Sequence, residues 1–78
     1  MVRKLDPERR EKFLESALNL FAKNGVQHTT TAAIAAEAGA AAGTLFLYFP
    51  TRQDLIHSLV LRISRLQSEY LYSLLQSS

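Results

Sequence analysis

Residues 31–50 read TAAIAAEAGAAAGTLFLYFP, and they indicate the architecture of the whole 78-residue chain. Helices are expected over residues 31–38 and 42–49, because apolar residues recur at helical spacing on both sides of Gly39. Gly39 allows the positive φ of a tight turn, and Ala35 is small enough for the two helices to cross closely. The expected core contacts are Ile34, Ala40 and Leu45. A helix-turn-helix and an αα-hairpin in a helical bundle share this outline, so the residues alone leave both open.

The segments on either side of this stretch also have helical patterns. Asp6 and Pro7 are residue types preferred at the N-cap and first position of a helix, and Gly25 is typical of a helix end. The buried face of this first helix is predicted to comprise Phe13, Ala17, Leu20 and Phe21. After the stretch, residues 51–54 read TRQD, a variant of the capping box that predicts the start of a fourth helix.

The fourth helix is expected to run to the chain end, because no Gly or Pro follows residue 54. Its apolar stripe comprises Leu55, Leu59, Ile63, Leu66, Tyr70 and Leu74. The part beyond Arg62 has nothing in a chain of this length to pack against, so we expect it to form an interaction patch. No useful polar and apolar alternation indicates a strand. The predicted fold class is all-α: a three-helix bundle with a helix-turn-helix, plus a long fourth helix.

The composition excludes several classes of protein. The absence of Cys rules out disulfides and thiolate zinc sites, and two isolated His residues do not make a metal-ligand set. No apolar run reaches the roughly 20 residues of a membrane span, and the N-terminus lacks a signal-peptide core. No Ser, His and acid cluster and no glycine-rich phosphate loop is suggested. We therefore expect a soluble cytoplasmic protein that is not an enzyme and that needs no cofactor.

The charge distribution is more informative than the net charge of +2. Residues 1–23 hold six of the nine basic residues, whereas residues 24–51 hold neither Lys nor Arg and only one acid, Glu37. A segment with so little charge is expected either to be buried or to lie in close contact with a partner.

A series of residues between positions 17 and 55 has the order and spacing of a known family signature. It comprises Ala17, Leu20, Phe21, Gly25, Thr29, Thr30, Ile34, Ala35, Ala38, Gly39, Gly43, Thr44, Leu45, Phe46, Leu47, Tyr48, Phe49, Pro50, Arg52 and Leu55. In these residues the chain resembles the tetracycline-repressor-like (TetR) family of transcriptional regulators. The stretch Gly-Thr-Leu-aromatic-x-Tyr-Phe-Pro is the most specific part of the resemblance.

The resemblance implies a bacterial repressor that binds a palindromic, double-stranded operator as a homodimer and is released by a small-molecule effector. Residues 1–50 are then the helix-turn-helix head. Residues 51–78 are the fourth helix, leading into a C-terminal domain for ligand and dimer that this sequence does not contain. A helical protein–protein module, whose long helix pairs with a partner, is the competing interpretation. A membrane-surface helix has little support, because Arg62 and Arg65 alone are on its later polar face.

The resemblance also implies which residues meet the bases. In a helix-turn-helix, the N-terminal residues of the second helix lie nearest the base edges in the major groove. That helix is residues 42–48 here, so contacts are expected from Ala41, Ala42 and Gly43. Alanine methyl groups suit a thymine methyl, and relatives often have longer or polar residues at these positions. Specificity is therefore expected to rest on shape, water or apolar contacts.

Other residues are expected to contact phosphates or to line the groove. The hydroxyls of Thr44 and Tyr48 can reach phosphate oxygens. Leu47 has a position that faces the groove in relatives. The position of Phe46 is often Tyr in relatives. Core packing and a thymine contact both remain open for Phe46. Core packing is the simpler role for an aromatic cluster of this kind, and we expect it for Phe49.

Two predicted helix N-termini are also candidate phosphate sites. One is at Thr30 and Thr31, and the other is at Arg52, where relatives usually have a phosphate-binding Lys. The alternatives for Arg52 are a solvated side chain and an ion pair with Asp54.

Overall fold

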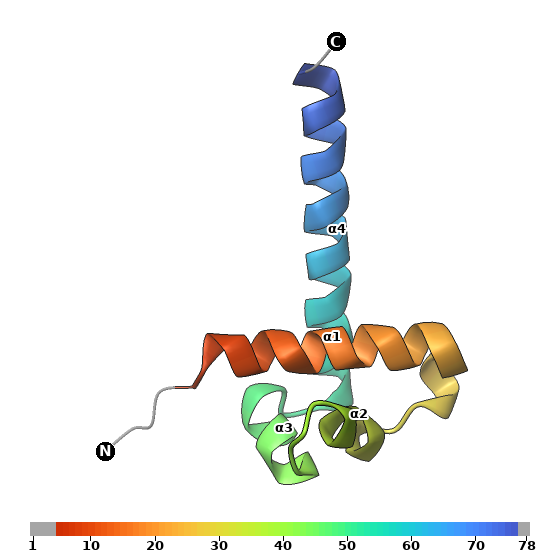
Figure 1. Ribbon diagram of the computed structural model, residues 1–78, viewed down its shortest axis with the longest axis vertical. Coiled ribbons are helices and arrows are strands. Elements are labelled where there is room, and N and C mark those ends of the chain that lie inside the picture. Colours follow the sequence, from red (N-terminus) through yellow and green to blue (C-terminus); the bar gives the residue numbers. More distant parts are fainter. Residues whose placement is uncertain (1–4, 77–78) are drawn as a thin grey trace.

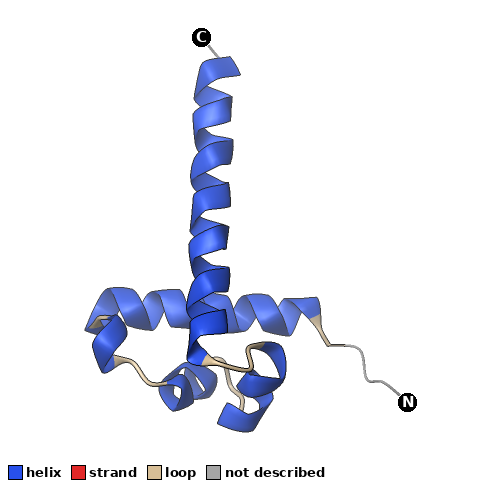
Figure 2. Cartoon of the chain, turned by 180° about the vertical axis from the view of Figure 1, so that it is seen from behind, coloured by secondary structure: helices blue, strands red, loops and turns tan. Residues whose placement is uncertain are grey.

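The computed structural model describes the backbone of residues 5–76 and the side chains of residues 5–65. Its elements, in chain order, are α1 (Pro7–Asn24), the 3-10 turn η1 (Val26–His28), α2 (Thr31–Glu37), α3 (Ala42–Tyr48) and α4 (Arg52–Gln76). Helices account for nearly all of the described chain, and this part of the chain contains no strand (Figure 2). The predicted all-α fold with a long fourth helix is confirmed.

The core of the molecule lies where α1, α2, α3 and the first turns of α4 meet. Its buried apolar residues are Phe13, Leu14, Ala17, Ile34, Ala35, Leu45, Phe49, Leu55 and Leu59. Leu20, Phe21 and Ala40 pack against this cluster and are partly buried. The predicted inner face of α1 and the predicted core contacts of the two short helices are therefore confirmed, as is core packing for Phe49.

Local signals explain where α1 begins and ends. The Asp6 carboxylate accepts a hydrogen bond from the Glu8 N–H at 3.0 Å, which caps the helix, and Pro7 takes the first position. The Gly25 N–H closes the helix on the Phe21 carbonyl at 2.8 Å. Gly25 has the expected positive φ of 87°, but its ψ of 152° lies outside the left-handed helical region, so it turns the chain directly into η1.

The turn between α2 and α3 is a Schellman motif. The Ala40 N–H donates to the Ala35 carbonyl at 2.8 Å, and the Gly39 N–H donates to the Ala36 carbonyl at 3.0 Å. Gly39 has a φ of 78°, which confirms the predicted positive φ at this position. The axes of α2 and α3 are bent by 97° relative to each other, within the range for the two helices of a helix-turn-helix.

The fourth helix extends away from the other three (Figure 1). Its start is the predicted capping box: the Asp54 N–H donates to the Thr51 hydroxyl oxygen at 3.1 Å, and the Thr51 N–H donates to the Asp54 carboxylate at 3.1 Å. Leu55 and Leu59 are buried, whereas Val60 and Leu61 are 54% and 56% exposed. The predicted stripe residues beyond position 65 lie outside the described side chains; they are Leu66, Tyr70 and Leu74.

Among the described residues, no single helix has the length and hydrophobicity needed to cross a membrane. The two short helices, α2 and α3, reach that length and hydrophobicity only when they are joined, and the 97° bend separates them. Of the large apolar residues in these two helices, Ile34 and Leu45 are buried in the core of the head, whereas Phe46 and Leu47 are exposed.

Candidate nucleic-acid interface

The two faces of α3 differ sharply in exposure. Leu45 is fully buried, and it anchors the helix to the core. On the opposite side Gly43 is exposed, Phe46 is 41% exposed and Leu47 is 66% exposed. Residues 42, 44 and 48 are half-buried at the edges of this face. The outer face of α3, defined here as Gly43, Phe46 and Leu47 with the exposed N-cap at residue 41, is therefore apolar and open to solvent.

The beginning of α3 has no side-chain cap. Ala41 is the N-cap residue, and its methyl group cannot accept a hydrogen bond from the first N–H groups of the helix. No atom lies within 4 Å of the position that a Cβ on Gly43 would have. Packing within the head therefore does not require glycine at this position. The predicted base-contacting residues Ala41 and Gly43 are exposed, and Ala42 is half-buried beside them.

Thr30 and Thr31 lie at the start of α2, as predicted. The Thr30 hydroxyl oxygen is the cap of this helix, because it accepts a hydrogen bond from the Ala33 N–H at 3.1 Å. Thr30 is exposed and Thr31 is half-buried. The hydroxyl proton of Thr30 is not used by this cap, so it can still be donated outward. The preceding residue, Thr29, is buried, and its hydroxyl donates to the Gly25 carbonyl at 2.8 Å.

Tyr48 links the end of α3 to the start of α1. Its hydroxyl oxygen accepts a hydrogen bond from the Asp6 N–H at 3.0 Å. Its ring packs edge-on against Phe13, with centroids 5.5 Å apart and an angle of 61° between the planes. The side chain is thus held in place by the core, and the hydroxyl retains a proton that can be donated to a phosphate oxygen. The sequence predicted the phosphate contact but not the link to Asp6.

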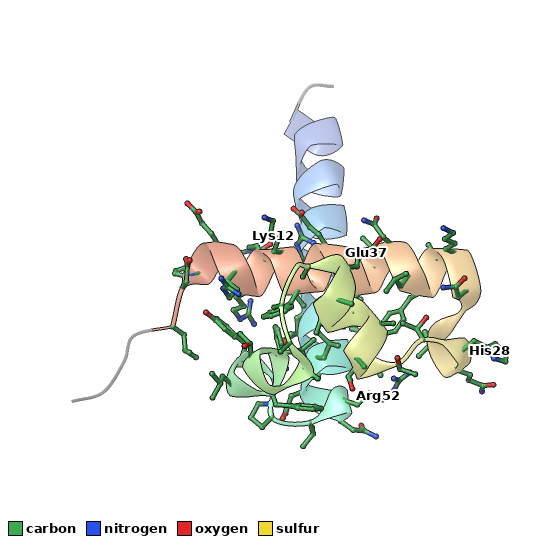
Figure 3. The ribbon with its side chains drawn as sticks, turned by 60° about the horizontal axis from the view of Figure 1, so that its bottom comes forward. Lys12, His28, Glu37 and Arg52 are labelled. Carbon is green, nitrogen blue, oxygen red and sulfur yellow. The ribbon has the colours of Figure 1, made fainter. Side chains whose placement is uncertain are left out.

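Arg52 has a set of partners that the sequence did not reveal. Its guanidinium donates to the Thr29 carbonyl at 2.6 Å and also to the Val26 carbonyl, and it lies 5.9 Å from the centroid of the Phe21 ring. Figure 3 shows the labelled Arg52 at the base of α4, with His28 on the turn at the edge of the head. Arg52 is therefore neither a solvated side chain nor the partner of Asp54, the two alternatives considered from sequence. Its predicted phosphate contact stays a prediction.

Two further arginines, Arg62 on α4 and Arg10 on α1, also have defined partners. Arg62 forms ion pairs with Glu11 at 3.2 Å and with Glu15 at 3.9 Å. Arg10 lies over the Phe49 ring at 5.2 Å and is 3.9 Å from Glu11. The ion pairs of Arg62 join α4 to α1, and the contact of Arg10 with Phe49 joins α1 to the residue after α3.

One surface hollow among the described residues has the wrong charge for binding DNA. It has a volume of about 540 Å³ and lies between the first half of α1 and the turn after α2. Its lining comprises Asp6, Glu8, Arg9, Glu11, Lys12, Glu15, Ala38 and Gly39. Four carboxylates outnumber two cations there, so the hollow does not favour phosphate. Within the described part of the chain, no three His, Asp or Glu side chains cluster in a way that could hold a metal.

Comparison with known proteins gives consistent results. Residues 13–59 match the family described as bacterial regulatory proteins, tetR family. The chain is 36% identical over 64 residues to the HTH-type transcriptional regulator LuxR of Vibrio harveyi, covering 82% of this chain and 31% of the relative. It is 31% identical over 72 residues to the nucleoid occlusion factor SlmA of Haemophilus ducreyi, covering 91% of this chain and 36% of the relative. A Bacillus subtilis fatty acid metabolism regulator is 35% identical over 48 residues, which are 62% of this chain and 25% of the relative. The chain thus spans about a third or less of these relatives.

Proposed function

Because this chain belongs to the tetR family of bacterial regulatory proteins, we propose that it is the DNA-binding part of a transcriptional regulator, with α2 and α3 as its helix-turn-helix. The family is one of DNA-binding regulators without enzymatic activity, in agreement with the prediction from sequence. The observation that carries the proposal is the geometry of α3, which crosses α2 at 97° and has an exposed face without charged side chains.

In the proposed complex, the outer face of α3 enters the major groove of duplex DNA. Residues 41–43 then lie nearest the base edges, since the N-terminal part of a recognition helix is the part closest to the bases. Thr44 and Tyr48, half-buried at the edge of this face, are proposed to contact backbone phosphates. Tyr48 suits this role because its position is fixed by Phe13 and Asp6 while its hydroxyl proton stays available. The exposed start of α2, at Thr30, is proposed as a further phosphate contact.

The role of the whole protein extends this proposal. We propose a cytoplasmic repressor that binds a palindromic operator as a homodimer and releases it when a small molecule binds a C-terminal domain. Two observations support a further domain. The relatives are about two and a half times as long as this chain, and α4 leaves the head with Val60 and Leu61 more than half exposed. A domain that packs around the continuing helix would cover such residues.

The DNA-binding proposal is tested by replacing each of two exposed leucines by glutamate. Leu47→Glu puts negative charge on the outer face of α3, and Leu61→Glu puts it on α4, away from that face. Both side chains are more than half exposed, so neither change should unfold the head. Fluorescence anisotropy with duplex DNA is expected to show steeply salt-dependent binding that Leu47→Glu abolishes and Leu61→Glu retains.

The opposite pattern would support the protein–protein module instead. That alternative predicts no DNA affinity above the non-specific level at low salt. It also predicts that Leu61→Glu, at an exposed apolar position of α4, is the change that removes partner binding. The two proposals therefore differ in which of the two leucines matters.

A further inference from the structure

The outer face of α3 presents methyl and aromatic carbon atoms to a base pair, in place of hydrogen-bonding side chains. Between Ala38 and Thr51 the sequence has no charged residue and no Asn or Gln. The two side-chain hydroxyls on α3 belong to Thr44 and Tyr48, which are half-buried at the edge of the face. The side chains that project furthest are Leu47, at 66% exposed, and Phe46, at 41% exposed.

This composition matches one feature of the major groove and no other. Side-chain readout of guanine uses Arg or Lys, of adenine Asn or Gln, and of cytosine an acid, and α3 has none of these. Thymine, in contrast, presents a C5-methyl group that an apolar side chain can cover. A base edge with hydrogen-bonding groups loses water against Leu47 or Phe46 without gaining a partner, so its burial there is unfavourable.

Resting on the proposed DNA-binding function, we propose that α3 identifies its operator by the methyl groups of thymines that Phe46 and Leu47 cover. Gly43 lies on the same face, one helical turn before both residues, and open space surrounds the position its Cβ would have. The backbone of α3 can therefore approach the groove floor closely enough for the two longer side chains to reach base edges. Each half-site then contains thymines at the positions opposite these two residues.

A preference for A·T pairs can also arise without any methyl contact. A·T-rich segments have a narrow minor groove and a stiffness of their own, and both can be selected through the shape of the duplex. Replacing thymine by deoxyuridine removes only the methyl group and keeps the base-pairing edge. This substitution therefore separates readout of the methyl from readout of duplex shape.

The experiment starts from a duplex selected from random DNA by the protein. Thymines in the selected half-site are replaced one at a time by deoxyuridine, and affinity is measured by fluorescence anisotropy. Covering one methyl is expected to contribute about fourfold in affinity, so the substitutions opposite Phe46 and Leu47 should each weaken binding by about that factor. Deoxyuridine in the flanking DNA should leave affinity unchanged.

A double-substitution cycle shows which side chain covers which methyl. In Leu47→Ala, deoxyuridine at the position opposite residue 47 should no longer matter, because the covering side chain has been removed. Leu61→Ala, with a similarly exposed leucine on α4, is the matched control and should retain the full effect. Phe46→Ala should remove the effect of a different thymine.

Three outcomes would overturn the inference. A selected half-site without thymine would do so, and so would deoxyuridine substitutions that leave affinity unchanged throughout. Equal effects of deoxyuridine in Leu47→Ala and in the parent protein would show that this residue does not cover the methyl. In each of these cases the protein still selects a sequence, so the proposed function stands. Failure to select any sequence contradicts the proposed function itself.

Discussion

Arg52 has two candidate roles, a structural link within the head and a contact with a DNA phosphate. Replacing Arg52 by Lys tests the two roles against each other. The guanidinium donates to the carbonyls of Thr29 and Val26, and it lies over Phe21. Its role in the free protein is therefore to fasten the start of α4 to the segment that leads into α2. A lysine ammonium keeps the positive charge but is a single point charge without the planar fork, so it cannot reproduce both hydrogen bonds in the same geometry.

The magnitude follows from these contacts. A hydrogen bond with a charged partner contributes about 1.5–3 kcal/mol to the free energy of unfolding. The bond to the Val26 carbonyl is exposed, so solvent weakens it. We therefore expect Arg52→Ala to lower the free energy of unfolding by about 2 kcal/mol, which for a domain of this size is roughly a 10 °C fall in Tm. Arg52→Lys should lose about half of this. Arg65→Ala, at an exposed arginine on the same helix, should change stability by less than about 0.5 kcal/mol.

Thermal and urea denaturation of the DNA-free protein measures these differences. Amide hydrogen exchange should also become faster across residues 26–30 in both Arg52 variants and stay unchanged in Arg65→Ala. If Arg52→Lys and Arg52→Ala are both as stable as the parent, the fastening role is refuted. Salt-dependent DNA binding then addresses the phosphate role. A phosphate contact predicts that Arg52→Ala lowers the slope of log affinity against log salt by about 1, and fastening alone predicts an unchanged slope.

Three further predictions concern residues with distinct environments. Gly43→Ala should leave Tm equal or slightly higher, because alanine favours the helix and its Cβ meets open space. The same change should weaken DNA binding, measured by fluorescence anisotropy, because the added methyl group holds the backbone away from the bases. Leu45→Ala, at a fully buried position, should cost about 2–5 kcal/mol, measured by urea denaturation; a loss below 1 kcal/mol would contradict the packing described. Arg62→Ala should cost less than about 1 kcal/mol, because the ion pairs with Glu11 and Glu15 are partly exposed, and the difference should shrink as salt is raised.

The sequence predicted those parts of the fold whose signals are local. Caps and glycines lie within a few residues of the helix ends that they define. The start of α1 at Pro7 and the turn at Gly39 were therefore readable from neighbouring residues. The close crossing of α2 and α3 was expected because Gly39 allows a tight turn and Ala35 is small, but the residues alone left the angle between the helices open.

The contacts of Tyr48 and Arg52 could not be predicted in the same way. Tyr48 is 42 residues from Asp6, and Arg52 is 23 and 26 residues from its two carbonyl partners. Such pairs form only when the whole head has folded. Every residue type has a backbone carbonyl, so the sequence does not show which carbonyl accepts a hydrogen bond. The one available signal was that Arg52 is an arginine, with its planar fork, where the family resemblance led us to expect a lysine.

Selection of duplex sequences from a random library by this protein, followed by sequencing, decides whether α2 and α3 recognise DNA. We expect an enriched half-site with thymines at defined positions, whose enrichment disappears in Leu47→Glu and persists in Leu61→Glu. A bound pool with the same composition as the starting library would contradict the claim that α2 and α3 form a sequence-specific DNA-binding surface. So would a motif that Leu47→Glu selects equally well.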